Sequence, residues 1–168
     1  MSIQTIRRAL IASGLVLGAV AAFTPNASAG TTGSVTLGGT VTSTLTMTSV
    51  STGGASALTL GGGASEQIVQ VADISMSTNN EQGLTLTATS GDLTKAGGTA
   101  IAFQVTSVAD GVSAPATGDF AIASGTDYTV QSAAAGNLVK DLYIKYTPAA
   151  LQDPGNYAGS ISLTVADR

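Results

Sequence analysis

Ten carboxylates are the side chains of this sequence best suited to acid–base or metal chemistry. The sequence contains no His and no Cys, which excludes Ser-His-Asp and Cys-His catalysis, thiol chemistry and most zinc sites. The carboxylates are spread singly along the chain, and a glycosidase pair could form only if folding brought two of them together. Trp is absent and aromatic residues make up 4% of the chain, although carbohydrate enzymes usually line their clefts with aromatics. We therefore predict that the protein is not an enzyme and carries no metal or cofactor.

One loop sequence could still bind a ligand. The stretch "ADGVSAPATGD" (109–119) places two carboxylates in a segment rich in small residues. A calcium loop needs its oxygen ligands in tighter spacing, so a plain turn is the favoured interpretation. Glycine-rich stretches such as "LGGTV" lack the Lys-Ser or Lys-Thr pair of a phosphate loop, which argues against nucleotide binding.

The most informative constellation is Asp153, Gly155 and Tyr157 in "LQDPGNYAG". Asp-x-Gly-x-Tyr at the start of a strand resembles the tyrosine corner of immunoglobulin-like sandwiches. In that motif the tyrosine hydroxyl bonds backwards to the main chain and fixes the corner between the fifth and sixth strands. Pro154 and Gly155 suit the turn itself. A simple turn followed by an edge tyrosine would give the same residues.

The segments that must position these residues read as strands. Apolar residues recur at every second position, Thr and Val are frequent, and Gly, Asn, Asp and Pro clusters separate the segments. This pattern predicts an all-β protein, an antiparallel immunoglobulin-like sandwich that is either complete or lacks its C-terminal strand. The expected strands lie within residues 34–47, 67–76, 83–90, 100–105, 119–124, 138–146 and 157–165.

Residues 1–29 are predicted to be a secretory signal peptide. Arg7 and Arg8 precede an apolar run, and "ASA" before Gly30 suits cleavage. The run is short for a bilayer span, so we expect a secreted mature chain with no membrane span. Loss of both arginines would lower the net charge from −4 to −6, which argues against nucleic acid as a partner. We expect a donor-strand candidate at 30–42 and one sandwich domain at 43–168.

The last predicted strand has an open side. Tyr157, Gly159, Ile161, Leu163 and Val165 alternate with small or polar residues, and an immunoglobulin-like sandwich would pair this sixth strand with a seventh. The sequence offers no further strand after it, so its edge would lie open beside an apolar groove.

A candidate to fill that groove lies near the other end of the chain. Val35, Leu37, Gly39 and Val41 share one face of "SVTLGGTV" (34–41). This segment could pair with the open edge within one chain or between chains, and the sequence leaves both arrangements open. Gly39 fits either a shallow part of the groove or a bulge between two strands.

At both ends the chain resembles cysteine-free pilins of the chaperone–usher route, of the colonisation-factor and spore-coat-U-like type. The shared features are "GNYAGSISLTV" (155–165), a Gly-x-Tyr-x-Gly strand with apolar alternation, and "GSVTLGGTVTSTLTM" (33–47), a donor segment that leads into the first strand. The resemblance implies donor-strand exchange with other copies or related subunits, and a periplasmic chaperone and outer-membrane usher as partners.

These observations predict a structural subunit of an extracellular, cell-surface fibre that is exported through the periplasm. The alternative is a secreted monomeric binding module, similar to an adhesin, that recognises sugar or protein through its loops. The two differ in the use of residues 30–41, which would pair with another chain in a fibre and with the chain's own residues 157–165 in a monomer.

Overall fold

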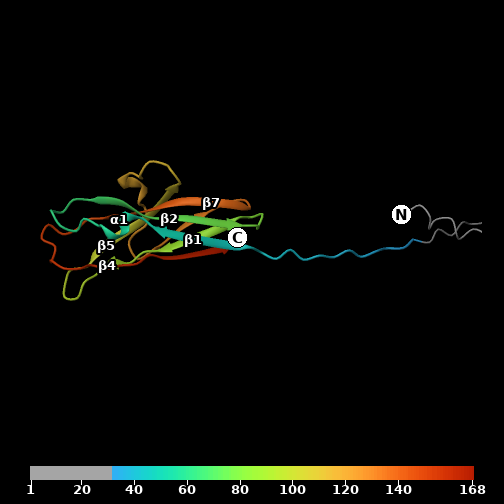
Figure 1. The fold of residues 1–168 in the computed structure, drawn as a ribbon, viewed down its shortest axis with the longest axis horizontal. Helices are drawn as coiled ribbons and strands as arrows, with labels where there is room; N and C mark the ends of the chain where they lie inside the picture. The colour runs from blue at the N-terminus through green and yellow to red at the C-terminus, as the bar shows by residue number, and fades with distance from the viewer. Residues whose placement is uncertain (1–31) are drawn as a thin grey trace, which may run out of the picture. The chain divides into compact units, whose positions relative to one another are not determined.

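The structure is a computed structural model that describes residues 32–168. The predicted signal peptide therefore lies outside the described residues, as do Gly30 and Thr31 of the donor candidate. The chain divides into two units, residues 1–39 and Thr40–Arg168, and the second unit contains all of the assigned elements. Its strands are β1 (Leu45–Ser51), β2 (Gln67–Thr78), β3 (Leu84–Thr89), β4 (Asp92–Leu93), β5 (Ile101–Ala109), β6 (Asp127–Gln131), β7 (Gly136–Tyr146) and β8 (Ser162–Asp167). Two short helical turns, α1 (Gly53–Ser56) and a 3₁₀ turn (Thr117–Asp119), complete the set (Figure 1).

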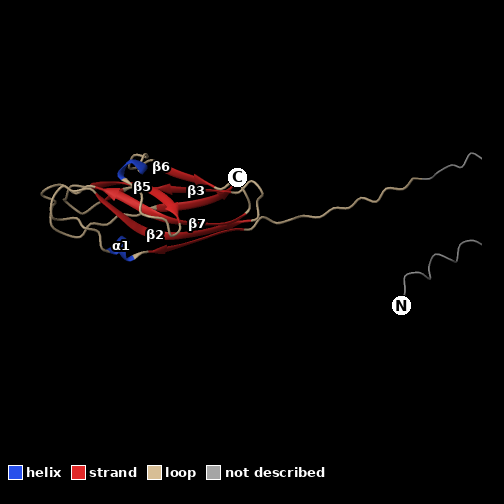
Figure 2. Cartoon of the chain, turned by 90° about the horizontal axis from the view of Figure 1, so that it is seen from above, coloured by secondary structure: helices blue, strands red, loops and turns tan. Residues whose placement is uncertain are grey.

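The strands form two antiparallel sheets. A five-stranded sheet has the order β1-β2-β7-β5-β4, and a three-stranded sheet has the order β6-β3-β8. Figure 2 shows strands through most of the body. The prediction of an all-β, antiparallel protein is confirmed at this level.

The inner faces of the two sheets share one apolar core. Ile74 and Met76 of β2 are 0% and 1% exposed, and Leu84 and Leu86 of β3 are 0% exposed. In each pair, the residue between the two buried ones points away from the core. This alternation is expected for strands with one face on the core and one face in solvent. Because the sequence has no Cys, this core must stabilise the fold without disulfides.

One predicted strand is wrong, and two strands, β4 and β6, were missed. Residues 119–124 form no strand, because Phe120 is buried and the side-chain amide of Gln104 donates to the carbonyl oxygens of Phe120 and Ile122 (3.0 and 2.8 Å). These carbonyl groups therefore accept hydrogen bonds from a side chain and not from the backbone of a neighbouring strand. The strand in this region is β6, which begins shortly after the left-handed Gly125 (φ +78°) and pairs with β3.

The last strand is shorter than predicted at its start. β8 begins at Ser162, whereas the expected strand began at Tyr157. The preceding residues run along β4 instead: Thr94 and Ala158 exchange two backbone hydrogen bonds of 2.8 and 2.9 Å. At Gly159 a Cβ atom would lie 2.9 Å from the carbonyl oxygen of Asp92, so the close approach to β4 requires glycine. The segment therefore crosses from the edge of one sheet to the other before β8 begins.

Candidate functional site: an apolar groove between β1 and β8

The candidate site is the opening between two edge strands. β1 ends the five-stranded sheet, β8 ends the three-stranded sheet, and the two strands contact each other. At one end of this opening the Ser43 hydroxyl donates to the Asp167 carboxylate. Figure 1 shows the C-terminus beside the start of β1. We call the space between the two strands the β1–β8 groove.

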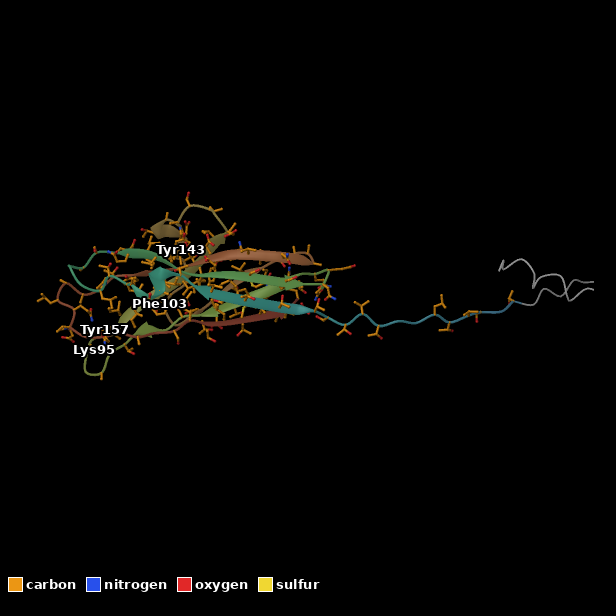
Figure 3. All side chains as sticks on the ribbon, in the orientation of Figure 1. Lys95, Phe103, Tyr143 and Tyr157 are labelled. Carbon is orange, nitrogen blue, oxygen red and sulfur yellow. The ribbon has the colours of Figure 1, made fainter. Side chains whose placement is uncertain are left out.

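Away from the Ser43–Asp167 contact, the groove reaches the core. A cavity of about 230 Å³ opens there, and its floor includes Phe103, Leu142 and Ile144. Figure 3 labels Phe103 within the body. Ser49 and Ser51 of β1 line one side, Ile161 and Leu163 line the other, and Ala55 and Leu58 lie at the margin next to α1.

Side chains along both walls are only half-buried. Leu45 and Met47 of β1, and Leu163 and Val165 of β8, pack against the core without being covered completely. If another element covered these apolar side chains, the free energy of the protein would fall, because apolar surface would be removed from water.

Two rows of backbone groups border the groove. Arg168 N–H donates to Gly83 O (3.1 Å), so the even-numbered residues of β8 face β3, and Leu163, Val165 and Asp167 direct their N–H and C=O groups the other way. On β1, bonds from Asn79 to Thr44 and from Thr52 to Val71 assign the even-numbered residues to β2. Within residues 32–168, β1 and β8 each pair with one strand only. The groove therefore offers a ladder on both sides.

The predicted acceptor residues lie in three different places. Ile161, Leu163 and Val165 lie half-buried along the groove, as the alternation predicted. Gly159 lines the cavity but lies in no strand. Tyr157 belongs to the corner and packs against the core beside the β4 end.

The predicted donor residues are exposed. Val35, Leu37 and Val41 are 85%, 89% and 87% exposed, and a Cβ atom at Gly39 would meet no other atom within 4 Å. No strand is assigned to residues 32–44, although the alternation predicted a strand that continues into β1. The apolar face of the donor candidate is thus uncovered.

The hydroxyl of Tyr157, at the predicted corner, has a different hydrogen-bond partner from the one expected. The tyrosine hydroxyl accepts a 2.6 Å bond from the side-chain amide of Gln152, which also donates to Thr99 O (2.9 Å), so the predicted main-chain partner is wrong. Asp153 accepts from Thr99 N–H (3.3 Å). Lys95 donates to Pro154 O (2.7 Å), and Figure 3 labels Lys95 and Tyr157 close together. These contacts attach the turn before β8 to the β4–β5 connection.

Sequence reasoning missed the opposite wall of the groove. Ser49, Ser51 and Leu58 gave no signal, because alternation identifies a strand without showing whether it lies at an edge. Phe103 was part of a predicted strand, but its position on the groove floor depends on sheet order, which a local pattern does not contain.

Two carboxylates do meet in space, on the outer side of the larger sheet. Asp73 and Asp141 are direct cross-strand partners in β2 and β7. Asp141 is 5% exposed and accepts the N–H of Gly111 (3.2 Å), so it serves as a structural acceptor for the turn after β5. Burial and these two carboxylates raise the pKa of Tyr143. Within the described residues, no group of three or more potential metal ligands occurs, and no helix is long and apolar enough to cross a membrane.

A larger hollow of about 490 Å³ lies beside β5 and β7, and its lining includes Glu66 and Lys145. Its ionisable side chains satisfy one another: Lys145 pairs with Glu66 (3.9 Å) and donates to Thr117 O (3.1 Å), and the Thr117 hydroxyl donates to Glu66 (2.5 Å). The predicted loop 109–119 is thereby fastened to the body.

Comparison with protein-family models, curated proteins and solved structures finds no match to this chain.

Proposed function

We propose that the protein is a structural subunit of an extracellular fibre that assembles by donor-strand complementation. The observation that carries this proposal is the β1–β8 groove, which opens toward the core and whose two bordering strands each pair with one strand only within residues 32–168. Strand addition at a sheet edge uses main-chain hydrogen bonds for affinity and alternate side chains for specificity. Both requirements are met by the groove and by the exposed alternating residues of segment 34–41.

The order of the strands supports an immunoglobulin-like sandwich. The run β1-β2-β7-β5 corresponds to the A-B-E-D sheet of that fold, and the pair β3-β8 corresponds to strands C and F. In this assignment β4 and β6 are additional short strands. The seventh strand of that fold, G, pairs with F. Because β8 corresponds to F, strand G would lie along the free edge of β8.

The proposed occupant of the groove is segment 34–41 of a second copy. Val35, Leu37 and Val41 occupy one face of that segment, and the cavity of about 230 Å³ can hold aliphatic side chains of this kind. A contact in which the segment of one copy fills the groove of the next is heterologous, so it does not close and generates a filament. Export across the inner membrane, and handling by a chaperone and an usher, follow from the pilin resemblance and belong to the same proposal.

The test compares the mature chain (residues 30–168) with a variant that lacks residues 30–41. The mature chain should form polymers whose mass rises with protein concentration, and the deletion variant should stay small and be less stable. A peptide of residues 30–42, added in trans, should raise the melting temperature of the deletion variant by binding its folded state. A mature chain that stays a stable monomer at high concentration, with segment 34–41 protected by its own chain, would overturn the proposal.

The second candidate function is a monomeric binding module. The 490 Å³ hollow favours it, because a concave surface with a few polar groups is a common form of ligand site. The ion pair of Lys145 with Glu66 leaves this hollow without net charge from those two residues, so a neutral ligand rich in hydroxyl groups would suit it. Binding of neutral oligosaccharides by the deletion variant would support this candidate independently of assembly.

A further inference from the structure

The residues that precede β1 are held by one side chain, Asn79. Its side-chain carbonyl accepts from Thr44 N–H (2.9 Å), and its side-chain amide donates to Thr42 O (2.9 Å). Its backbone N–H donates to Thr44 O (3.3 Å), in register with the β1–β2 ladder. In an extended chain, residues two positions apart turn their backbone groups to the same side, and Thr42 and Thr44 do so here. Asn79 therefore continues the hydrogen bonding of the β1–β2 ladder back to Thr42.

The residue between them is held from the other side. The Ser43 hydroxyl donates to Asp167, whose second oxygen accepts from the Thr78 hydroxyl (2.6 Å). The C-terminal residue is fixed as well, because Asn80 donates to Arg168 O (2.7 Å) and the Arg168 guanidinium donates to Ser132 O (3.2 Å). We call Asn79, Asp167 and their bonds to residues 42–44 the exit clamp.

The exit clamp lies where the chain would have to reverse. For segment 34–41 to enter the groove of its own chain, it would have to fold back along β1, with a tight turn between Val41 and Leu45. Such a turn would direct the backbone groups of residues 42–44 away from Asn79 and would break the contact of Ser43 with Asp167. The three residues Thr42, Ser43 and Thr44 also lack the glycine that hairpin turns favour.

We propose that the exit clamp prevents self-complementation: it keeps segment 34–41 from entering its own groove and leaves it available to a second copy. This inference rests on the proposed fibre function and assigns regulation of the same groove to Asn79 and Asp167. Neither residue lines the groove cavity, so their effect is exerted through the direction of the chain.

The test uses the mature chain with Asn79→Ala, with Asp167→Asn, and with the pair Thr42→Asn and Ser43→Gly, which introduces an Asn-Gly hairpin turn and removes the Ser43 hydroxyl. Asn137→Ala is the matched control, since Asn137 lies on β7 next to the same end of β2 and makes no side-chain hydrogen bond within the described residues. Far-ultraviolet circular dichroism confirms that each variant is folded. Hydrogen exchange by mass spectrometry then measures protection of segment 34–41 in dilute, monomeric protein, and light scattering measures assembly.

In the wild type and in Asn137→Ala, segment 34–41 should exchange freely at low concentration. Each hydrogen bond lost from the clamp should shift the balance toward the self-filled state about fivefold. Protection should therefore rise roughly tenfold or more in Asn79→Ala and be largest in the Asn-Gly variant, with a matching loss of assembly rate. If folded clamp variants leave segment 34–41 as unprotected as in the wild type, the inference is wrong. A wild type that fails to assemble contradicts the fibre function, whereas the exchange readout still tests the clamp because it requires no assembly.

Discussion

The most direct test of the groove places one negative charge on either face of the donor segment. Leu37 lies on the apolar face, and Thr36 lies on the opposite face one residue away. A peptide of residues 30–42 that carries Leu37→Asp has the same net charge as one that carries Thr36→Asp. The long-range repulsion from the acidic protein is the same for both peptides, so a difference in their binding reports which face enters the groove.

The expected difference follows from burial. Leu37 is 89% exposed in the free chain, so covering it would contribute about 1.5–3 kcal/mol. Leu37→Asp loses this contribution and also buries a carboxylate without a partner, which costs about 2 kcal/mol or more. The sum exceeds about 3 kcal/mol, or a hundredfold in the dissociation constant. Thr36→Asp should cost less than about tenfold, since its side chain stays in water.

The measurement is fluorescence anisotropy of labelled peptides titrated with the variant that lacks residues 30–41. A peptide with Leu37→Ala is the uncharged comparison. It should bind about thirtyfold more weakly than the wild-type peptide, because only the buried apolar surface is lost. Equal weakening by Leu37→Asp and Thr36→Asp would refute the alternating insertion, because it would show that neither face is selectively buried. Tighter binding of a scrambled peptide would refute sequence-specific filling of the groove.

Four further outcomes are expected. Tyr157→Phe removes the 2.6 Å bond from Gln152 and should lower the free energy of unfolding by about 1 kcal/mol, measured as the midpoint of urea denaturation with an unchanged slope. Hydrogen bonds from Ser43 and Thr78 lower the pKa of Asp167, so its contribution to stability is full above about pH 4 and is lost as the pH falls through the lowered pKa; Asp167→Asn should flatten this acid dependence in thermal melts. Gly83→Ala should destabilise the fold by more than about 1 kcal/mol, because Gly83 has φ +85° and a Cβ atom would lie 2.3 Å from Ser132 O; a melting temperature equal to that of the wild type would contradict this. Millimolar calcium should leave the melting temperature unchanged, and a rise of several degrees would reveal a metal site.

The period-two pattern predicted four of the strands in residues 32–168 well, because the inner faces of these strands are strongly apolar. β2, β3, β5 and β7 each contain a predicted strand or match it closely, and each contributes residues to the common core. The pattern failed at residues 119–124. There Phe120 is buried, but the carbonyl oxygens of Phe120 and Ile122 accept hydrogen bonds from the Gln104 side chain and not from a neighbouring strand. It also failed to show β6, whose Tyr128 and Val130 are only half-buried, so its local signal is weak.

The alternating residues of the candidate site could be predicted from the sequence, whereas its contacts between distant parts of the chain could not. Ile161, Leu163 and Val165 were placed on one face by alternation, and the structure places them along the groove. The start of β8 was misplaced because Gly159 approaches β4, a contact between distant parts of the chain that no local pattern contains. Likewise, the spacing of Asp153, Gly155 and Tyr157 suggested a corner, but the bond partner Gln152 depends on the path of its side chain.

The sheet edges differ in how they are protected, which bears on the proposed assembly. Within residues 32–168 the two sheets end in four strands: β1, β4, β6 and β8. The β4 edge is covered at Thr94 by Ala158 and flanked by Lys95, whereas the one charge of β6, Asp127, accepts a hydrogen bond from the Thr89 hydroxyl. In β1 the sequence "LTMTSVS" contains neither charge nor proline, and in β8 the only charge is Asp167 at the end, where the carboxylate is bound by Ser43 and Thr78. Natural β proteins commonly protect open edges with charges, prolines or covering segments, because such edges recruit further strands. Of the edges without that protection, β1 and β8 face each other across an opening to the core, which is the arrangement expected under the proposal that a strand from another copy enters there.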